Sequence, residues 1–156
     1  MNRSRGPIPG RRGRSTAMKV MVLGKATERS EAGELGTPEE FVAMNRFTEE
    51  LVEAGVVLAG DGLQPSSKGK RVAFDVDGGT RVIDGPFAEA KELIAGFSIW
   101  EVASMDEAVE WVKRSPLRDC EVELRKVLDA EDFADSFPAE LAAAEERMPE
   151  DAAAKQ

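Results

Sequence analysis

Two capped amphipathic helices, each set between short apolar segments, place the narrowest limits on the fold of this chain. A Thr-Pro-Glu-Glu segment at residues 37–40 has an N-cap residue, a proline at the first helical position and a glutamate that completes a capping box. Apolar residues then recur every three or four positions as far as Gly55. Ser104 and Glu107 predict a second capping box before another apolar stripe. The sequence therefore predicts two helices that each bury one face.

Short apolar segments flank both predicted helices. Residues 18–23 are apolar almost without interruption, which is typical of a strand buried on both faces. Residues 56–59 form a second such segment directly after the first helix. Residues 94–103 and 120–125 carry strand patterns on either side of the second helix. Each helix is thus expected to connect two strands.

A hairpin is predicted between the two strand–helix–strand units. Residues 71–76 alternate apolar and polar side chains, and a Gly-Gly turn at residues 77–80 leads back into residues 81–83. The predicted order is therefore strand, helix, strand, hairpin, strand, helix, strand. This order is a split βαβ pattern, so we expect an α+β, ferredoxin-like fold with a hairpin insertion.

The first strand predicts self-association. Met21 and Leu23 alternate with Val20 and Val22, so both faces of the strand are apolar. Two helices cover only one face of an antiparallel sheet, and an exposed apolar sheet face is uncommon in a monomer. We therefore expect a symmetric homodimer in which these faces pack together.

The composition excludes several classes of chemistry. The 156 residues contain no histidine, which excludes His-assisted nucleophilic catalysis and His-ligated zinc. Cys120 is the only cysteine, so the chain has neither an internal disulfide nor a cysteine metal cluster. Because Cys120 alternates with charged residues, we expect it to be buried and unreactive. We accordingly predict no metal site and no cofactor.

Charge and hydropathy indicate the cellular location of the protein and the classes of partner that it can bind. The net charge of −9 argues against broad binding of nucleic acid or of anionic membranes. No apolar run approaches the roughly 20 residues that span a bilayer. The N-terminus lacks the apolar segment of a secretory signal. We expect a cytoplasmic protein that binds neither membranes nor, directly, nucleic acid.

The two ends differ from the central domain, which is predicted at residues 18–137. Residues 1–17 contain five arginines and no acid, and we expect a basic, disordered extension. Two other interpretations stay open: an arm that binds acidic partners, or a true start at Met18 rather than Met1. For residues 138–156, the sequence predicts an exposed helix over 138–148, followed by a polar tail.

A family resemblance rests on several motifs in the same order. Residues 83–92, IDGPFAEAKE, resemble the DGPF signature of the YCII-related (DGPF domain) family. Four other segments also resemble parts of that family. They are the loop AGDGLQPSSKG at 59–69, the strand LIAGFSIWEV at 93–102, the helix DEAVEW at 106–111 and the strand EVELR at 121–125. The resemblance covers residues 18–137.

This resemblance implies a fold but leaves the chemistry open. The family is similar to the dimeric α+β barrel group, in agreement with the predicted fold. Its members are suspected enzymes without an agreed substrate, and many resemble companions of extracytoplasmic-function sigma factors. Close relatives often have histidine where this chain has Gln64, and the His–Asp pair proposed for the wider group cannot form without histidine. This chain therefore either uses an aspartate alone or binds without turnover.

Asp84 is the predicted acid or base of such a site. It ends a predicted strand and precedes the motif turn Gly85-Pro86-Phe87, which could hold its carboxylate rigidly. The same position suits an aspartate that only caps the amides of the turn. The two roles are compatible, because an aspartate bonded to amides stays ionised.

Five further residues are candidates for substrate binding. Gln64 and Ser66 could bind a polar ligand, or simply belong to a solvated loop. Lys91 could pair with Asp84, or be an ordinary surface lysine. We expect Trp100 on the open face of the sheet, as a core or interface residue or as a substrate platform. Arg125 could neutralise an acidic ligand or a neighbouring glutamate.

Two functions follow as hypotheses. In the first, a small homodimeric enzyme uses Asp84 to exchange a proton with a small polar molecule at the dimer seam, where burial would raise the pKa of the carboxyl. In the second, the protein is a non-catalytic ligand sensor or regulatory partner of an extracytoplasmic-function sigma factor, and its acidic surface docks on a basic one. The DGPF turn favours the first, and the missing histidine favours the second.

Overall fold

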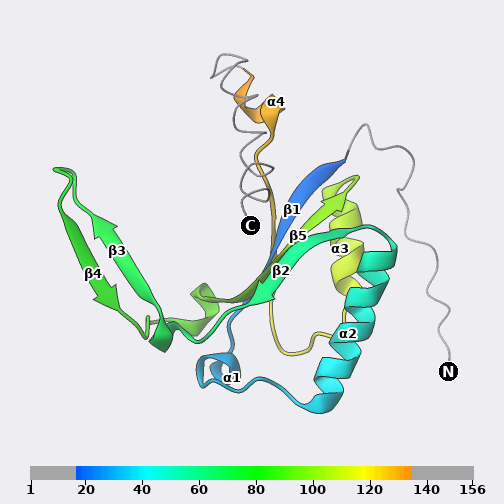
Figure 1. Cartoon of the computed structure of the whole chain (residues 1–156), viewed down its shortest axis with the longest axis horizontal. Helices are drawn as coiled ribbons and strands as arrows, with labels where there is room; N and C mark the ends of the chain where they lie inside the picture. The colour runs from blue at the N-terminus through cyan, green and yellow to red at the C-terminus, as the bar shows by residue number, and fades with distance from the viewer. Residues whose placement is uncertain (1–16, 135–156) are drawn as a thin grey trace, which may run out of the picture. The chain divides into compact units, whose positions relative to one another are not determined.

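The computed structural model describes residues 17–134 (Figure 1). The chain divides after Arg125 into two units. Residues 1–16 of the predicted basic extension, and the helix and tail predicted for 138–156, lie outside the described residues. Among the helices that are described, none has the length and apolar character needed to cross a membrane.

A four-stranded sheet dominates the first unit. Its strands are β1 (Met18–Lys25), β2 (Val57–Gly62), β5 (Ile94–Val102) and β6 (Val122–Lys126), in the spatial order β2-β5-β1-β6. β5 pairs antiparallel with both β1 and β2. This interleaved order confirms the predicted α+β, ferredoxin-like fold.

The first predicted helix is confirmed as α2 (Pro38–Glu53), together with its capping box. The Thr37 hydroxyl accepts from the Glu40 amide at 3.2 Å, and the Glu40 carboxylate accepts from the Thr37 amide at 3.0 Å. The Thr37 amide, and then the Arg29 guanidinium, lower the pKa of Glu40. The helix therefore begins where the sequence predicts, with a carboxylate held in its charged form.

The second predicted helix, α3 (Met105–Lys113), has only half of the expected box. Ser104 accepts from the Glu107 amide at 3.1 Å, as predicted. The Glu107 carboxylate instead accepts from the Ala103 amide at 2.5 Å, one residue before the N-cap. Glu107 is buried, and this bond provides its side chain with a partner inside the protein.

The core lies between these two helices and one face of the sheet. Its buried residues are Val20, Phe47, Leu51, Val56, Trp100, Val102, Ala108 and Trp111. The Phe47 ring meets Trp100 edge-on, with 6.4 Å between the ring centroids. Trp100 is the register partner of Val20, so it shares the helix-covered face. The prediction that Trp100 lies on the open face is wrong, whereas its interpretation as a core residue is confirmed.

The other face of the sheet is apolar as well. Met21 pairs with Ile99, and Leu23 pairs with Phe97. Because side chains alternate along a strand, these four half-buried residues share the face opposite Val20. This is the apolar surface from which the sequence predicts a homodimer, and the homodimer stays a prediction.

The predicted hairpin is confirmed as a separate two-stranded sheet. β3 (Lys70–Phe74) and β4 (Thr80–Asp84) pair antiparallel, and neither joins the four-stranded sheet. The Asp75 amide donates to the Gly79 carbonyl at 2.8 Å to close the turn. Gly78 has φ +87°, a conformation that favours glycine.

Four short elements escape the sequence prediction. α1 (Glu28–Glu31) forms within a segment expected to be a loop. Two 3-10 turns, Ser66–Lys68 and Ala90–Glu92, flank the hairpin, and α4 (Ala130–Phe133) follows β6. β2 also extends to Gly62, beyond its predicted end. These elements depend on local hydrogen bonds, so an apolar pattern does not reveal them.

Two neighbouring residues of α2 test the assignment of the core. Leu51 is 4% exposed and Val52 is 60% exposed. We expect Leu51→Ala to lower the free energy of unfolding by about 2–5 kcal/mol, because it removes packed methyl groups from the core. Val52→Ala should change it by less than about 0.5 kcal/mol. Urea unfolding followed by circular dichroism measures both, and equal effects would contradict the assigned orientation of α2.

Candidate functional site

The DGPF turn packs against the loop that precedes β3, and Gly85 is the point of closest approach. A Cβ atom on Gly85 would lie 1.7 Å from the carbonyl oxygen of Ser66, so no residue with a side chain fits without a shift of the backbone. The Gly85 amide donates to the Gly69 carbonyl at 3.0 Å. The Gly85–Pro86 peptide bond is cis. The glycine of the motif thus has a packing role.

Ser66 connects three segments through its hydrogen bonds. Its hydroxyl donates to Glu31 of α1 at 2.5 Å and accepts from the Phe87 amide at 3.1 Å. Its amide donates to the other carboxylate oxygen of Glu31 at 3.0 Å. The Arg71 guanidinium lies 3.9 Å from the centre of the Phe87 ring. Ser66 and Phe87 therefore hold the base of the hairpin to α1.

The charged residues predicted for the site do not come together. Their ion pairs are Asp84–Lys70, Lys91–Glu89 at 3.9 Å and Arg125–Glu123 at 3.4 Å. Their side chains are 73%, 77% and 72% exposed, respectively. Lys91 therefore pairs with Glu89 rather than with Asp84, and Arg125 pairs with a neighbouring glutamate. Exposed pairs of this kind are weak and hold no fixed geometry for catalysis.

Gln64 and Ser66 line a shallow depression beside the DGPF turn. Its volume is about 390 Å³, and Lys68, Arg71 and Phe87 also contribute to its wall. The hydroxyl of Ser66 is already bonded on both sides, and Arg71 is stacked on Phe87. The polar side chains that remain in its wall are those of Gln64, Lys68 and Glu92.

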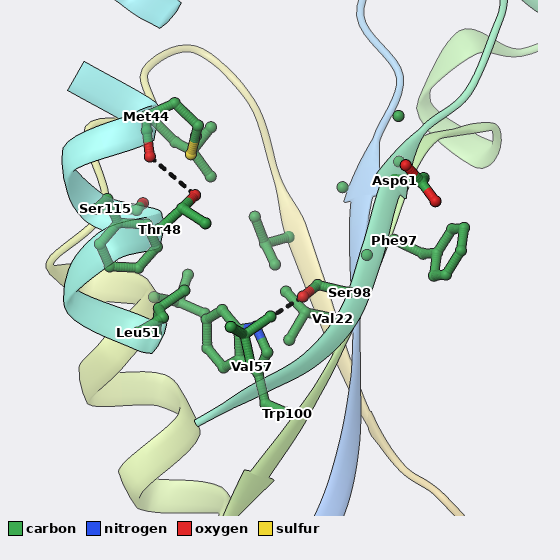
Figure 2. Close-up of a pocket in the computed structure, with 18 residues that line it drawn as sticks. Val22, Met44, Thr48, Leu51, Val57, Asp61, Phe97, Ser98, Trp100 and Ser115 are labelled. Atoms are coloured by element: carbon green, nitrogen blue, oxygen red, sulfur yellow. Dashed lines mark hydrogen bonds between the residues drawn. The ribbon is translucent and has the colours of Figure 1, made fainter. Parts of the chain in front are cut away.

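A larger cavity of about 460 Å³ lies between α2 and the four-stranded sheet. In Figure 2, Met44, Thr48 and Leu51 of α2 face Val57 and Trp100 of the sheet. Of the predicted site residues, Trp100 alone lines this cavity. Cavities of this size and apolar character are typical of small-molecule sites.

Three hydroxyl side chains line the cavity, those of Thr48, Ser98 and Ser115, and the first two are engaged within the protein. The Ser98 hydroxyl accepts from the Trp100 indole N–H at 2.8 Å and donates to the Ala59 carbonyl at 3.0 Å. The Thr48 hydroxyl donates to the Met44 carbonyl at 2.9 Å. Both hydroxyl oxygens keep a free lone pair but have no proton left to donate.

Among residues 17–134, Asp61 is the only ionisable residue in the lining. Figure 2 shows its side chain, with that of Phe97, on the far side of β2 and directed away from Met44 and Thr48. These two residues are register partners, so they share the opposite face of the sheet. The interior of the cavity is therefore uncharged.

Glycines leave one end of the cavity floor without side chains. Gly96 of β5 pairs with Gly24 of β1 on one side and with Gly62 of β2 on the other. A Cβ on Gly62 would meet nothing within 4 Å, and one on Gly24 would meet only a carbonyl oxygen at 3.8 Å. Glycine inside a strand pattern is the sequence signal that could have indicated this space.

Cys120 corrects one prediction about reactive groups. It is exposed rather than buried. It precedes β6, which begins at Val122, so the strand alternation that predicts an inward side chain does not apply to it. Partial burial, and then the Asp119 carboxylate, raise the pKa of its thiol, which keeps the thiol protonated near neutral pH. Within residues 17–134, no group of three or more His, Cys, Asp or Glu side chains is arranged to hold a metal ion.

Comparison with known proteins gives a domain match and a short similarity. The model of the YCII-related domain matches residues 18–131. An uncharacterised protein of Rhizobium meliloti (strain 1021) is 50% identical to this chain over 36 residues. That similarity spans 23% of this chain and 29% of the length of the Rhizobium protein.

The close approach of Gly85 to Ser66 can be tested with a second glycine of the same loop. We expect Gly85→Ala to destabilise the fold by about 1–3 kcal/mol, because its methyl group would overlap the Ser66 carbonyl. Gly69→Ala should be tolerated, since its Cβ would lie 3.5 Å from the nearest atom. Thermal unfolding of both variants makes the comparison, and an undisturbed Gly85→Ala protein would refute the packing role.

Proposed function

The chain belongs to the YCII-related domain family, and on that premise we propose that it binds a small, uncharged, largely apolar molecule between α2 and the four-stranded sheet. The observation that carries this proposal is the cavity of about 460 Å³. Its walls are the aromatic and aliphatic side chains of Phe47, Leu51, Val57 and Trp100. Burial of apolar ligand surface against such walls is favourable in itself.

The lining favours an uncharged ligand. No lysine or arginine of the described part of the chain lines the cavity, and the one acid there, Asp61, directs its side chain elsewhere. A charged ligand would lose its hydration without gaining an opposite charge, which is strongly unfavourable. This chemistry favours an apolar molecule over the small polar one expected from the loop residues.

The hydroxyls of Ser98 and Thr48 add a polar preference. Each oxygen can accept one more hydrogen bond, while its proton is committed to a backbone carbonyl. A ligand with a hydroxyl or N–H group satisfies them. We therefore propose an apolar body that carries one hydrogen-bond donor.

Catalysis by Asp84 is a separate proposal with less support. Its carboxylate is largely exposed, pairs with Lys70 and does not line the larger cavity. A catalytic role would require a dimer seam that covers this carboxylate. The regulatory alternative, a sigma-factor partner, rests on the family resemblance alone. The homodimer and the cytoplasmic location also remain predictions.

A substitution that fills the cavity tests the binding proposal. N-phenylnaphthylamine is a neutral fluorophore with one N–H donor, and its emission rises in apolar surroundings. We expect the full-length protein to bind it, with energy transfer from the two core tryptophans, Trp100 and Trp111. Gly24→Val should weaken binding by about tenfold or more, because its side chain enters the cavity where there is space for it. Unchanged binding by Gly24→Val would refute the site.

Two control variants and one control probe sharpen this test. Ala59→Val adds the same kind of bulk on the opposite face of the sheet, since Ala59 pairs with Ile99. Asp84→Asn removes the carboxylate of the motif. Neither should alter binding of the neutral fluorophore. The anionic anilinonaphthalene sulfonate should bind more weakly than the neutral probe, and the reverse order would contradict an uncharged interior.

A further inference from the structure

Ser115 carries the one hydroxyl of the cavity lining that no other group of the described chain engages. It lines the cavity together with Thr48 and Ser98. Its amide donates to the Val112 carbonyl at 3.0 Å, but its hydroxyl has no hydrogen-bond partner among residues 17–134. A serine hydroxyl can donate one hydrogen bond and accept two. Unlike Thr48 and Ser98, Ser115 therefore keeps its proton for a ligand.

The backbone position of Ser115 is fixed by its neighbours in the chain. Ser115 directly follows Arg114, the C-cap of α3, and the Arg114 guanidinium donates to the Glu50 carboxylate of α2 at 3.2 Å. This ion pair is partly buried and holds the end of α3 to α2. Pro116 comes next and restricts the backbone of the residue before it. A serine held in this way can present its hydroxyl to a ligand with little further loss of conformational entropy.

Thr48 and Ser115 together give the helix side of the cavity a donor and an acceptor. Figure 2 shows both residues on this side, whereas Ser98 belongs to β5 of the sheet. Glu50, the partner of Arg114, is two residues from Thr48 along α2, so the same ion pair fixes both segments. The proton of the Thr48 hydroxyl is committed to a backbone carbonyl, so this hydroxyl can only accept from a ligand. The Ser115 hydroxyl can donate to one.

We propose that Ser115 selects ligands whose polar group is a hydroxyl, so that the molecule bound between α2 and the sheet is a neutral alcohol or phenol. This inference rests on the binding function proposed above and narrows its ligand class. The oxygen of a ligand hydroxyl can donate its proton to Thr48 and accept the proton of Ser115. One atom then satisfies both side chains.

Two other polar groups suit this pair of hydroxyls less well. An aromatic amine can donate to Thr48, but its nitrogen lone pair is delocalised into the ring and accepts poorly from Ser115. The Ser115 proton would then lose water without gaining a partner, which is unfavourable. A carboxamide carries two N–H donors and a carbonyl, more polar groups than the two hydroxyls on this side can satisfy.

Three probes of similar shape test the selection: para-propylphenol, para-propylaniline and propylbenzene. All three are uncharged near neutral pH, and they differ only in carrying a hydroxyl, an amino group or neither. Each is titrated against N-phenylnaphthylamine bound to the full-length protein, and its affinity follows from the loss of fluorescence. We expect Ser115→Ala to weaken binding of para-propylphenol about fivefold, because one neutral hydrogen bond is lost. Binding of para-propylaniline and propylbenzene should stay unchanged.

A second serine provides the matched control. Ser67 is exposed and does not line the cavity, so Ser67→Ala should alter the affinity of none of the three probes. Thermal unfolding should give the same midpoint for Ser115→Ala as for the unsubstituted protein, because the Ser115 hydroxyl has no partner to lose. A clearly lower midpoint would show that the hydroxyl is already engaged, and would overturn the inference.

The results separate this inference from the function on which it rests. An equal effect of Ser115→Ala on all three probes, or no effect on any, would overturn the role of Ser115. Displacement of the fluorophore by those probes would still support the cavity as a binding site. If neither the fluorophore nor any probe binds, the proposed function is refuted together with the inference.

Discussion

The antiparallel register that joins β2, β5 and β1 determines both the core and the cavity. It pairs Val20 with Trp100 and so directs both toward the helices. Farther along the same strands, the same register aligns Gly24, Gly96 and Gly62 on that face. Large side chains such as Trp100 fill one end of the space between the helices and the sheet. The glycines have no side chains, so the other end of that space stays open as the cavity. A shift of one residue would exchange the two faces of a strand and remove the cavity.

The DGPF motif has a structural explanation that needs no catalysis. Gly85 is required by its approach to Ser66, and Phe87 is held by its amide and by the stacked Arg71. A motif that closes a turn tightly restricts which residues are tolerated, whatever happens elsewhere in the protein. Its first residue, Asp84, pairs with Lys70 at the surface. The motif identifies the family well, but it says little about where a ligand binds.

Most of the fold could be predicted from the sequence, because capping boxes and apolar periodicity are local signals. Thr37 and Glu40 mark the start of α2, and the alternation around Val72 marks the hairpin. The site could not be predicted in the same way. Which face Trp100 occupies depends on its cross-strand partner, and the space above Gly62 depends on a missing side chain. Both are tertiary properties, and the charged residues that attract attention in a sequence lie outside the cavity.

Charge and apolar surface therefore have separate roles in this protein. Charged side chains such as those of Lys91 and Glu89 are exposed, and their ion pair is weak because solvent screens it. In the cavity lining, Ser98 and Thr48 donate their protons to the backbone and offer lone pairs, and the Ser115 hydroxyl lies in the same lining. The ligand selection proposed for this cavity rests on shape, on apolar contact and on the desolvation cost that any charged molecule would bear. A chain without histidine can recognise a molecule in this way, because such recognition requires no titratable group.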